Sequence, residues 1–303
     1  MQYCEVENEL EIKGILMTNK KRLVPLWARV SLGIFVYTVI ATLSQVLASY
    51  VMNISLDSLI NPEKLSLNEL VVFQLFAFIA TFLSVYILRR YIDKKSFLSI
   101  GLIKDNIISN VLWGALLAIA LVCGMTTMLY VYGSIEIVSV DFNPQVLLKS
   151  FLLLLFVAVS EEIFMRGYIL NNLMESMHRY TALILSTVIF TLFHAINPHM
   201  NYIAVSNLFI AGILLGSVYV YTKNLWFSIS LHFFWNFLQS IFGYAISGVK
   251  VDSLVKMEFS QDTLLNGGEF GLEGSLLSTV FTALATLLIL MYFRKRDNIK
   301  TPI

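Results

Sequence analysis

Long apolar stretches separated by short polar connections fill the sequence between about residue 27 and residue 293. An α-helix needs about 20 apolar residues to cross a bilayer, because it rises roughly 1.5 Å per residue. Eight stretches reach or approach this length: 27–50, 69–90, 108–131, 147–170, 181–197, 202–221, 224–245 and 275–293. The fifth is short and ends at the helix-stopping pair Asn197–Pro198. We therefore predict an all-α, polytopic membrane protein with about eight transmembrane helices in one bundle.

No internal repeat or low-complexity segment interrupts this pattern, so we expect one membrane domain over residues 27–293. A cytoplasmic tail, residues 1–26, is expected before it, and a basic cytoplasmic tail, residues 294–303, after it. The first apolar stretch follows Lys20, Lys21 and Arg22, as in a signal peptide, but it exceeds the ~7–15 apolar residues of such a segment. We expect it to be retained as a membrane span.

The composition agrees with a membrane protein and narrows the function classes. Hydrophobic residues make up 57% of the chain and charged residues 14%, whereas about 25% is typical of soluble proteins. The net charge of +1 gives no reason to expect a nucleic-acid partner. The two cysteines, Cys4 and Cys123, fit no disulfide or metal-binding framework, and we expect Cys123 to be a packing residue.

Lysine and arginine predict the orientation, because cytoplasmic loops carry an excess of both. One side receives Lys13, Lys20, Lys21, Arg22, Arg89, Arg90, Lys94, Lys95, Lys104, Arg179, Lys223, Arg294, Lys295, Arg296 and Lys300; the other receives Lys64, Lys149, Lys250 and Lys256. Both termini should therefore be cytoplasmic. The longest connection, 246–274, should lie outside, and its glycines suggest a mobile loop or a short re-entrant segment.

Three charged residues follow the apolar run of the fourth predicted span: Glu161, Glu162 and Arg166. A charge at the centre of a membrane helix costs about 3 kcal/mol or more, so such residues face a bundle interior and usually serve a function. Glu162 and Arg166 stand four residues apart and can form an ion pair within the helix. Glu161 points about 100° away and is left free for another role.

Two other predicted spans also carry polar residues. His194 lies in the fifth span, and His232 and Asn236 lie one helical turn apart in the seventh. Because unpaired polar groups are costly in hydrocarbon, we expect the three helices to bring these groups together or to a wet cavity. A buried glutamate beside an imidazole suits activation of a water, and His232 with Asn236 could donate to an oxyanion.

Other residues have simpler interpretations. His178 and His199 are expected in interfacial loops, and Gly212 with Gly216 should form a small-residue face for close helix packing. Each histidine or asparagine alone could equally form an interhelical hydrogen bond, and Glu162–Arg166 alone would be structural. It is the combination across three helices that favours catalysis.

The motifs EEIFMR, FTLFH and HFFWN, in this order, resemble the family of type 2 CAAX prenyl proteases and bacteriocin-processing proteins, also called the CPBP or Abi family. The resemblance covers about residues 147–245, the motif core. It implies an intramembrane endopeptidase of largely helical fold, in which Glu161 and His194 activate water. His232 and Asn236 would stabilise the oxyanion, and Glu162 and Arg166 would hold the site together.

The resemblance leaves the metal and the substrate open. Glu161, His194 and His232 would be an adequate zinc ligand set, but we favour a mechanism without metal, since His232 and Asn236 are better explained as oxyanion donors. The substrate is expected to be a peptide or a membrane-associated protein. Bacteriocin immunity and exported-peptide maturation are both compatible roles. The resemblance to this family implies location in a bacterial cell membrane. The sequence indicates neither prenyl recognition nor an oligomeric state.

Straight helices would not bring these residues to one level. At 1.5 Å per residue, Glu161 would lie roughly 24 Å from the cytoplasmic face, His194 about 20 Å and His232 about 12 Å.

Two other function classes also use intramembrane polar residues. A transporter or proton relay should show paired halves with broken helices, which this sequence lacks. A non-catalytic immunity or scaffold protein that binds a peptide would keep its effect after Glu161→Ala.

Overall fold

The computed structural model describes residues 24–55, 57–58, 64–260 and 263–300. Each of the eight predicted stretches corresponds to a helix. These are α2 (Leu26–Met52), α4 (Leu67–Ile87), α5 (Ile107–Val131), α6 (Pro144–Glu162), α8 (Arg179–Phe193), α9 (Tyr202–Thr222), α10 (Trp226–Phe242) and α12 (Leu276–Lys300). Cys4, Lys13, Lys20, Lys21 and Arg22 lie outside the described residues.

The predicted all-α membrane fold is confirmed. Within the described residues, 5 helices are long and apolar enough to span a bilayer: α2, α4 with its extension to Ile92, α5, α9 and α12 to Arg296. The remaining three, α6, α8 and α10, are shorter or carry the polar residues of interest. A count of eight spans therefore stays a prediction.

Two helices continue in a wider helical form. α4 passes into the π-helix η2 (Leu88–Ile92), and α6 passes into the π-helix η4 (Ile163–Leu170) and then α7 (Asn171–Met174). Every residue of η4 is buried, and residues such as Phe164 and Tyr168 form the centre of the largest apolar core. π-helical turns are rare and often occur at functional sites. The segment that directly follows the two glutamates in the sequence, η4, is thus buried within the bundle.

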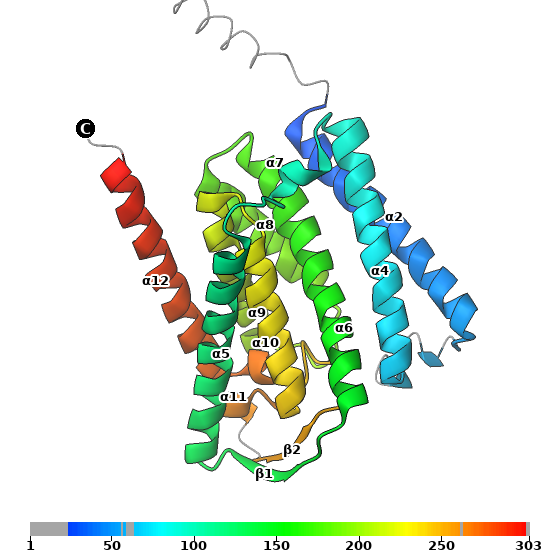
Figure 1. Cartoon of the computed structure of the whole chain (residues 1–303), viewed down its shortest axis with the longest axis vertical. Helices are drawn as coiled ribbons and strands as arrows, with labels where there is room; N and C mark the ends of the chain where they lie inside the picture. Colours follow the sequence, from blue (N-terminus) through cyan, green and yellow to red (C-terminus); the bar gives the residue numbers. More distant parts are fainter. Residues whose placement is uncertain (1–23, 56, 59–63, 261–262, 301–303) are drawn as a thin grey trace, which may run out of the picture.

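α6 lies between α4 and α10 (Figure 1). α10 packs mainly on α5 and α6, α9 packs on α8 and α12, and α4 lies between α2 and α6. Gly212 and Gly216 of α9 lie against α8, because an added Cβ would come 2.7 Å from Thr187 Cγ2 and 2.4 Å from Leu183 Cδ1. The predicted packing role of these glycines is confirmed.

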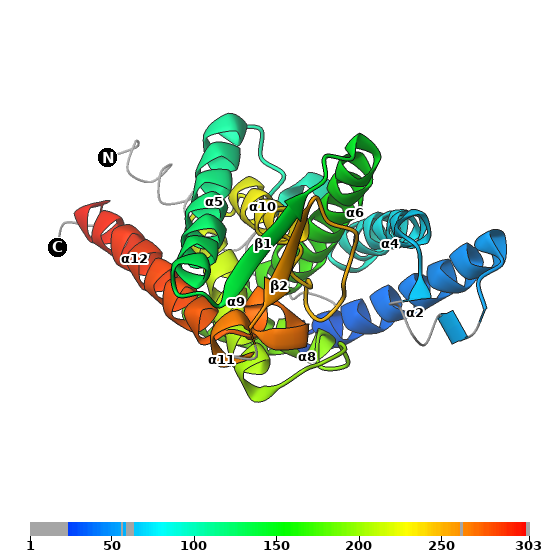
Figure 2. The ribbon, with the colours of Figure 1, turned by 90° about the horizontal axis from the view of Figure 1, so that it is seen from below.

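A two-stranded sheet at one end of the bundle was not predicted. β1 (Ile135–Val140) pairs antiparallel with β2 (Val255–Phe259), with an irregularity between Ile137 and Ser139. Figure 2 shows the two strands across the ends of α6 and α10. The strand β1 is rich in β-branched residues, which favour sheets, but its partner is distant in sequence.

The connection 246–274, expected to be a mobile loop or a short re-entrant segment, contains regular structure. Besides β2, it forms α11 (Thr263–Asn266), η5 (Gly268–Phe270) and η6 (Leu272–Gly274). Phe270 and Leu272 are buried, so apolar side chains anchor this segment in the protein.

A second difference concerns the end of the fifth predicted span. α8 ends at Phe193, and His194 is its C-cap rather than a residue within the helix. The amides of His194 and Ala195 bond to carbonyls three residues back, so the chain leaves the helix in tight turns. Pro198 disfavours helical geometry for the residue before it, and the helix stops earlier than the sequence pattern suggested.

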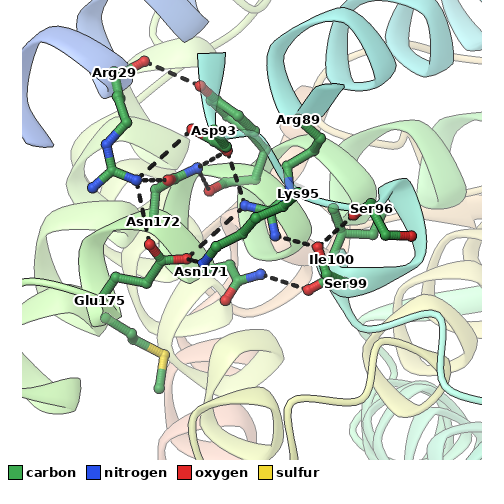
Figure 3. A network of polar contacts seen from close by, with 12 residues as sticks. Arg29, Arg89, Asp93, Lys95, Ser96, Ser99, Ile100, Asn171, Asn172 and Glu175 are labelled. Carbon is green, nitrogen blue, oxygen red and sulfur yellow. Dashed lines mark hydrogen bonds and ion pairs between the residues drawn. The ribbon is translucent and has the colours of Figure 1, made fainter. Parts of the chain in front are cut away.

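A buried cluster of polar residues joins α2, η2 and α7 (Figure 3). Arg29 of α2 donates to Asn172 Oδ1 at 2.7 Å and to Glu175 Oε2 at 3.3 Å. Asn172 Nδ2 donates to Asp93 Oδ2 at 3.1 Å, and Asp93 pairs with Arg89 at 2.9 Å. These contacts attach the first helix to the helix that carries Glu161 and Glu162.

Candidate active site

Three helices bring the predicted polar residues to one cavity of about 380 Å³. Glu161 lies at the end of α6, His194 caps α8, and His232 and Asn236 lie on successive turns of α10. All four line the cavity, whose wall is otherwise mostly apolar. Pockets of this volume and character are typical of binding sites for small ligands or short peptide segments.

Glu162 connects two of the three helices. Its Oε1 atom accepts from Arg166 Nη1 at 2.8 Å and from His232 Nδ1 at 2.9 Å. Both members of the ion pair are buried, with side-chain exposures of 0% for Glu162 and 2% for Arg166. The intrahelical ion pair predicted from the sequence is confirmed. The bond from His232 was not predicted, and it fixes the orientation of the imidazole.

Arg166 is held by further contacts that link it to α8 and α9. Nη2 donates to the carbonyl of Gly212 at 3.2 Å, and the guanidinium lies 4.6 Å from the ring centroid of Phe190. Gly212 also lets α9 lie close to α8, since an added Cβ would come 2.7 Å from Thr187 Cγ2. The Arg166 charge is thus satisfied by a carboxylate, a carbonyl and an aromatic face.

Glu161 faces both histidines with the same oxygen. Its Oε2 lies 3.7 Å from His194 Nε2 and 3.9 Å from His232 Nε2. These separations exceed a direct hydrogen bond. Glu161 Oε2 is buried and has no hydrogen-bond partner among the described residues. A buried, unpaired carboxylate oxygen between two imidazoles is suited to hold and deprotonate a water.

The other ring nitrogens define the proton positions. His194 Nδ1 lies 2.9 Å from the Phe190 carbonyl, which can only accept, so Nδ1 carries a proton. His232 Nδ1 donates to the Glu162 carboxylate in the same way. In a neutral ring, Nε2 is then an acceptor, and both Nε2 atoms point to the Glu161 oxygen. A water placed among the three could donate one proton to the Glu161 oxygen and the other to one of the two Nε2 atoms.

Straight helices of equal depth would place Glu161, His194 and His232 at different levels. In the structure, the helices begin at different depths. α10 has only 17 residues, and Figure 1 shows it beginning below the upper end of the α6–η4–α7 helix. Leu225, just before α10, donates its amide to the carbonyl of Gly101, so the connection after η3 (Phe97–Ile100) holds this helix start. His232 near the start of α10 therefore reaches the level of Glu161.

The cavity also contains polar residues that the sequence reasoning did not select. They are Tyr37, Gln74, Asn197, Ser247, Glu273 and Thr282. Gln74 could have been found, because it is a polar residue within an apolar span. Tyr37 stacks on Phe164 with ring centroids 3.9 Å apart, so α2 forms part of the cavity wall. Glu273 lies in the connection 246–274, which contains several acidic residues, so the sequence does not single it out.

The remaining residues considered from the sequence lie away from the cavity. His178 is the N-cap of α8 and accepts from the amide of Tyr180. His199 pairs with Glu269 at 2.9 Å on the surface. Cys123 lies within α5 and is partly buried. None of these residues lines the cavity that contains Glu161.

A metal site would have to use Glu161, His194 and His232. Among the residues that the structure describes, no three His, Cys, Asp or Glu side chains are grouped closely enough to hold a metal ion. Zinc ligands lie about 2.0–2.2 Å from the ion, so the ligand atoms of a tetrahedral site lie roughly 3.3–3.6 Å from one another. Glu161 Oε2 lies 3.7 Å from His194 Nε2 and 3.9 Å from His232 Nε2, slightly more than this spacing. The metal-free reaction stays a prediction.

Comparison with known proteins agrees with the motif-based resemblance. Residues 143–238 match the family model described as type II CAAX prenyl endopeptidase, Rce1-like. No curated protein matches the chain. The matched segment runs from the start of α6 into α10 and includes Glu161, His194, His232 and Asn236. The predicted resemblance is confirmed over this segment, which supports a membrane endopeptidase of the CAAX-protease type.

Proposed function

We propose that this protein is an intramembrane endopeptidase in which Glu161, with His194, activates a water that attacks a peptide carbonyl. The observation that carries the proposal is the unpaired Glu161 oxygen, which lies 3.7 Å from His194 Nε2 and 3.9 Å from His232 Nε2 on the wall of the cavity. General-base assistance of this kind contributes roughly 10²–10⁴-fold to a rate.

In the proposed mechanism, Glu161 takes a proton from the water as the oxygen bonds to the carbonyl carbon. The carbonyl oxygen becomes an oxyanion near α10, where Asn236 can donate a hydrogen bond. Collapse of this intermediate breaks the C–N bond, and the proton held by Glu161 passes to the leaving amine. A single oxyanion donor is worth about 2.7–4 kcal/mol in other hydrolases.

His232 can assist the oxyanion only in a particular protonation state. Its Nδ1 proton is committed to Glu162. Donation from Nε2 therefore requires a ring that carries both protons, and the Glu162 carboxylate stabilises that positive charge. Glu162 would thus support catalysis by orienting His232, and Arg166 would keep Glu162 in place through the 2.8 Å ion pair.

The proposed substrate is a peptide segment of a membrane-associated protein. The cavity is surrounded by membrane-type helices and lined mostly by apolar side chains, which favours an apolar peptide segment. The family model names CAAX prenyl endopeptidases, so peptides ending in a CAAX sequence are suitable first probes. Peptides with and without a farnesyl group separate recognition of the peptide from recognition of the lipid.

A test uses protein reconstituted in lipid nanodiscs and internally quenched peptides of both kinds, supplemented by a library of apolar peptides read by mass spectrometry. Glu161→Gln removes the base with little change of shape, and Glu136→Gln is the matched control, since Glu136 is exposed on β1. The proposal expects cleavage by the wild type and the control, and at least a 100-fold slower rate for Glu161→Gln. Equal rates for Glu161→Gln and wild type would exclude the proposed chemistry.

A further inference from the structure

A two-residue turn packs against the chain that follows His194. The amide and carbonyl groups of Ile246 and Val249 bond to each other at 2.9 and 3.0 Å and enclose Ser247 and Gly248. Both enclosed residues have positive φ, 47° and 88°, as tight hairpin turns of this kind require. We refer to residues 246–249 as the outer turn. Ile246, Ser247 and Val249 line the cavity, so the outer turn forms part of its wall.

The outer turn holds the chain that follows His194. Asn197 Nδ2 donates to the carbonyl of Ser247 at 3.2 Å, and the amide of Asn197 bonds back to the carbonyl of His194 at 3.0 Å. Gly248 lies so close to this chain that an added Cβ would come 2.1 Å from the carbonyl oxygen of Pro198. The position of the His194 turn therefore depends on the position of the outer turn.

Glu273 binds the outer turn and α10 at once. Its Oε2 accepts from the amide of Ser247 at 2.9 Å and from the Ser247 hydroxyl at 2.7 Å. Its Oε1 accepts from Trp235 Nε1 at 2.8 Å. Trp235 directly precedes Asn236. One carboxylate thus connects the segment behind His194 to the helix that carries His232 and Asn236.

The backbone of Glu273 is itself fixed. Asn207 of α9 donates to the carbonyl of Glu273 at 2.7 Å and to that of Ser275 at 2.8 Å. Gly271 packs directly on the chain before the outer turn, since an added Cβ would come 2.0 Å from the carbonyl oxygen of Ala245. Glu273 is therefore anchored to a third helix and acts from a rigid support.

We propose that Glu273 is a positioning residue, which sets the distance between His194 and the α10 residues. The inference rests on the proposed function, because it assigns Glu273 a role in that reaction. The two Glu273 oxygens accept three hydrogen bonds in total, so the carboxylate holds Ser247 and Trp235 in place. Its effect passes through Ser247 to the His194 turn and through Trp235 to α10. Misplacement of a reacting group by about 1 Å can cost 10²-fold in rate.

The first arm of the test measures position without a substrate. Hydrogen exchange by mass spectrometry, on the full protein in nanodiscs, follows the amides of residues 194–200 and 244–250. Glu273→Ala should increase exchange in both segments and leave α5 unchanged. Ser247→Ala, which removes one of the three donors, should give a smaller increase. The exposed carboxylate of Glu258 on β2 provides the matched control, Glu258→Gln, which should behave as wild type.

The second arm measures cleavage of the farnesylated and unmodified quenched peptides. Glu273→Ala should lower kcat by about 100-fold with KM within a few-fold. Glu273→Gln retains one acceptor oxygen and should fall between wild type and Glu273→Ala. In a His194→Ala background, Glu273→Ala should cause a smaller loss than in the wild type, since the part of its effect that is exerted through His194 is already absent. A residue needed only for stability would lower the unfolding temperature equally in both backgrounds and leave kcat per folded molecule unchanged.

Unchanged exchange at residues 194–200 in Glu273→Ala and Ser247→Ala would overturn the inference, as would losses that multiply with His194→Ala. Failure of the proposed function looks different. In that case Glu161→Gln would cleave like wild type, or the wild type would cleave none of the peptides, while the exchange arm would still report whether Glu273 holds the two segments together.

Discussion

Replacement of Glu162 by glutamine allows the roles of its two contacts to be measured separately. The contact with Arg166 concerns stability, and the contact with His232 concerns activity. The wild-type carboxylate balances the buried Arg166 charge and accepts from His232, at 2.8 and 2.9 Å. Glutamine has nearly the same shape, keeps one acceptor oxygen and lacks the negative charge. Arg166 would then keep its bond to Gly212 and its contact with Phe190 but lose its counter-charge.

The expected loss of stability is large. Removal of one partner from a buried ion pair costs about 3–5 kcal/mol, because a buried charge is left uncompensated. Typical proteins have only about 5–15 kcal/mol of net stability. The second change Arg166→Met removes the uncompensated charge, and the double variant Glu162→Gln/Arg166→Met should regain most of the stability. It should not regain activity, because the charge that orients and stabilises the His232 imidazolium is still absent.

Thermal unfolding in detergent and single-turnover cleavage of the quenched peptides measure the two effects separately. The exposed Glu136 again provides a control, Glu136→Gln. A Glu162→Gln protein as stable as wild type would refute the assignment of a buried, charged pair. A double variant with both full stability and full activity would show that Glu162 has no part in orienting His232.

Three further predictions concern the oxyanion, the metal and the topology. Asn236→Ala should lower kcat by about 10²–10³-fold with little change in KM, as steady-state kinetics would show. Purified wild-type protein should contain substoichiometric zinc by elemental analysis and keep its activity after prolonged chelation; stoichiometric zinc, lost together with activity in His194→Ala and restored by added metal in wild type, would refute a metal-free reaction. Cysteines introduced after residues 140 and 260 should react with an impermeant reagent in intact cells, since the lysine and arginine bias places both outside. Protection of the site after residue 260 would overturn this orientation.

The helices and the pairing within one helix were predictable because they depend on local spacing. The apolar stretches gave the helices, and the four-residue separation of Glu162 and Arg166 gave their ion pair. The convergence of His194 and His232 on Glu161 was expected from the cost of unpaired polar groups in hydrocarbon. The distances that join them, however, depend on where each helix begins.

Contacts between distant segments were not predictable from the pattern of the chain. The pairing of β1 with β2 joins residues 135–140 to residues 255–259. The bond between His232 and Glu162 spans 70 positions, and the bond between Arg29 and Asn172 spans 143. Glu273 shows the same limit, because nothing in its own neighbourhood indicates that it meets Ser247 and Trp235. Such contacts follow from the packing of whole helices.

The central claim is that Glu161 and the histidines act as one unit on a single water. The most direct measurement is single-turnover cleavage by Glu161→Ala, His194→Ala and the double variant, with membrane protein levels checked in each. If the residues cooperate, each single change should remove most of the rate, and the double variant should be no slower than either single variant. Losses that multiply in the double variant, or near-wild-type cleavage by Glu161→Ala, would contradict a shared role of Glu161 and His194.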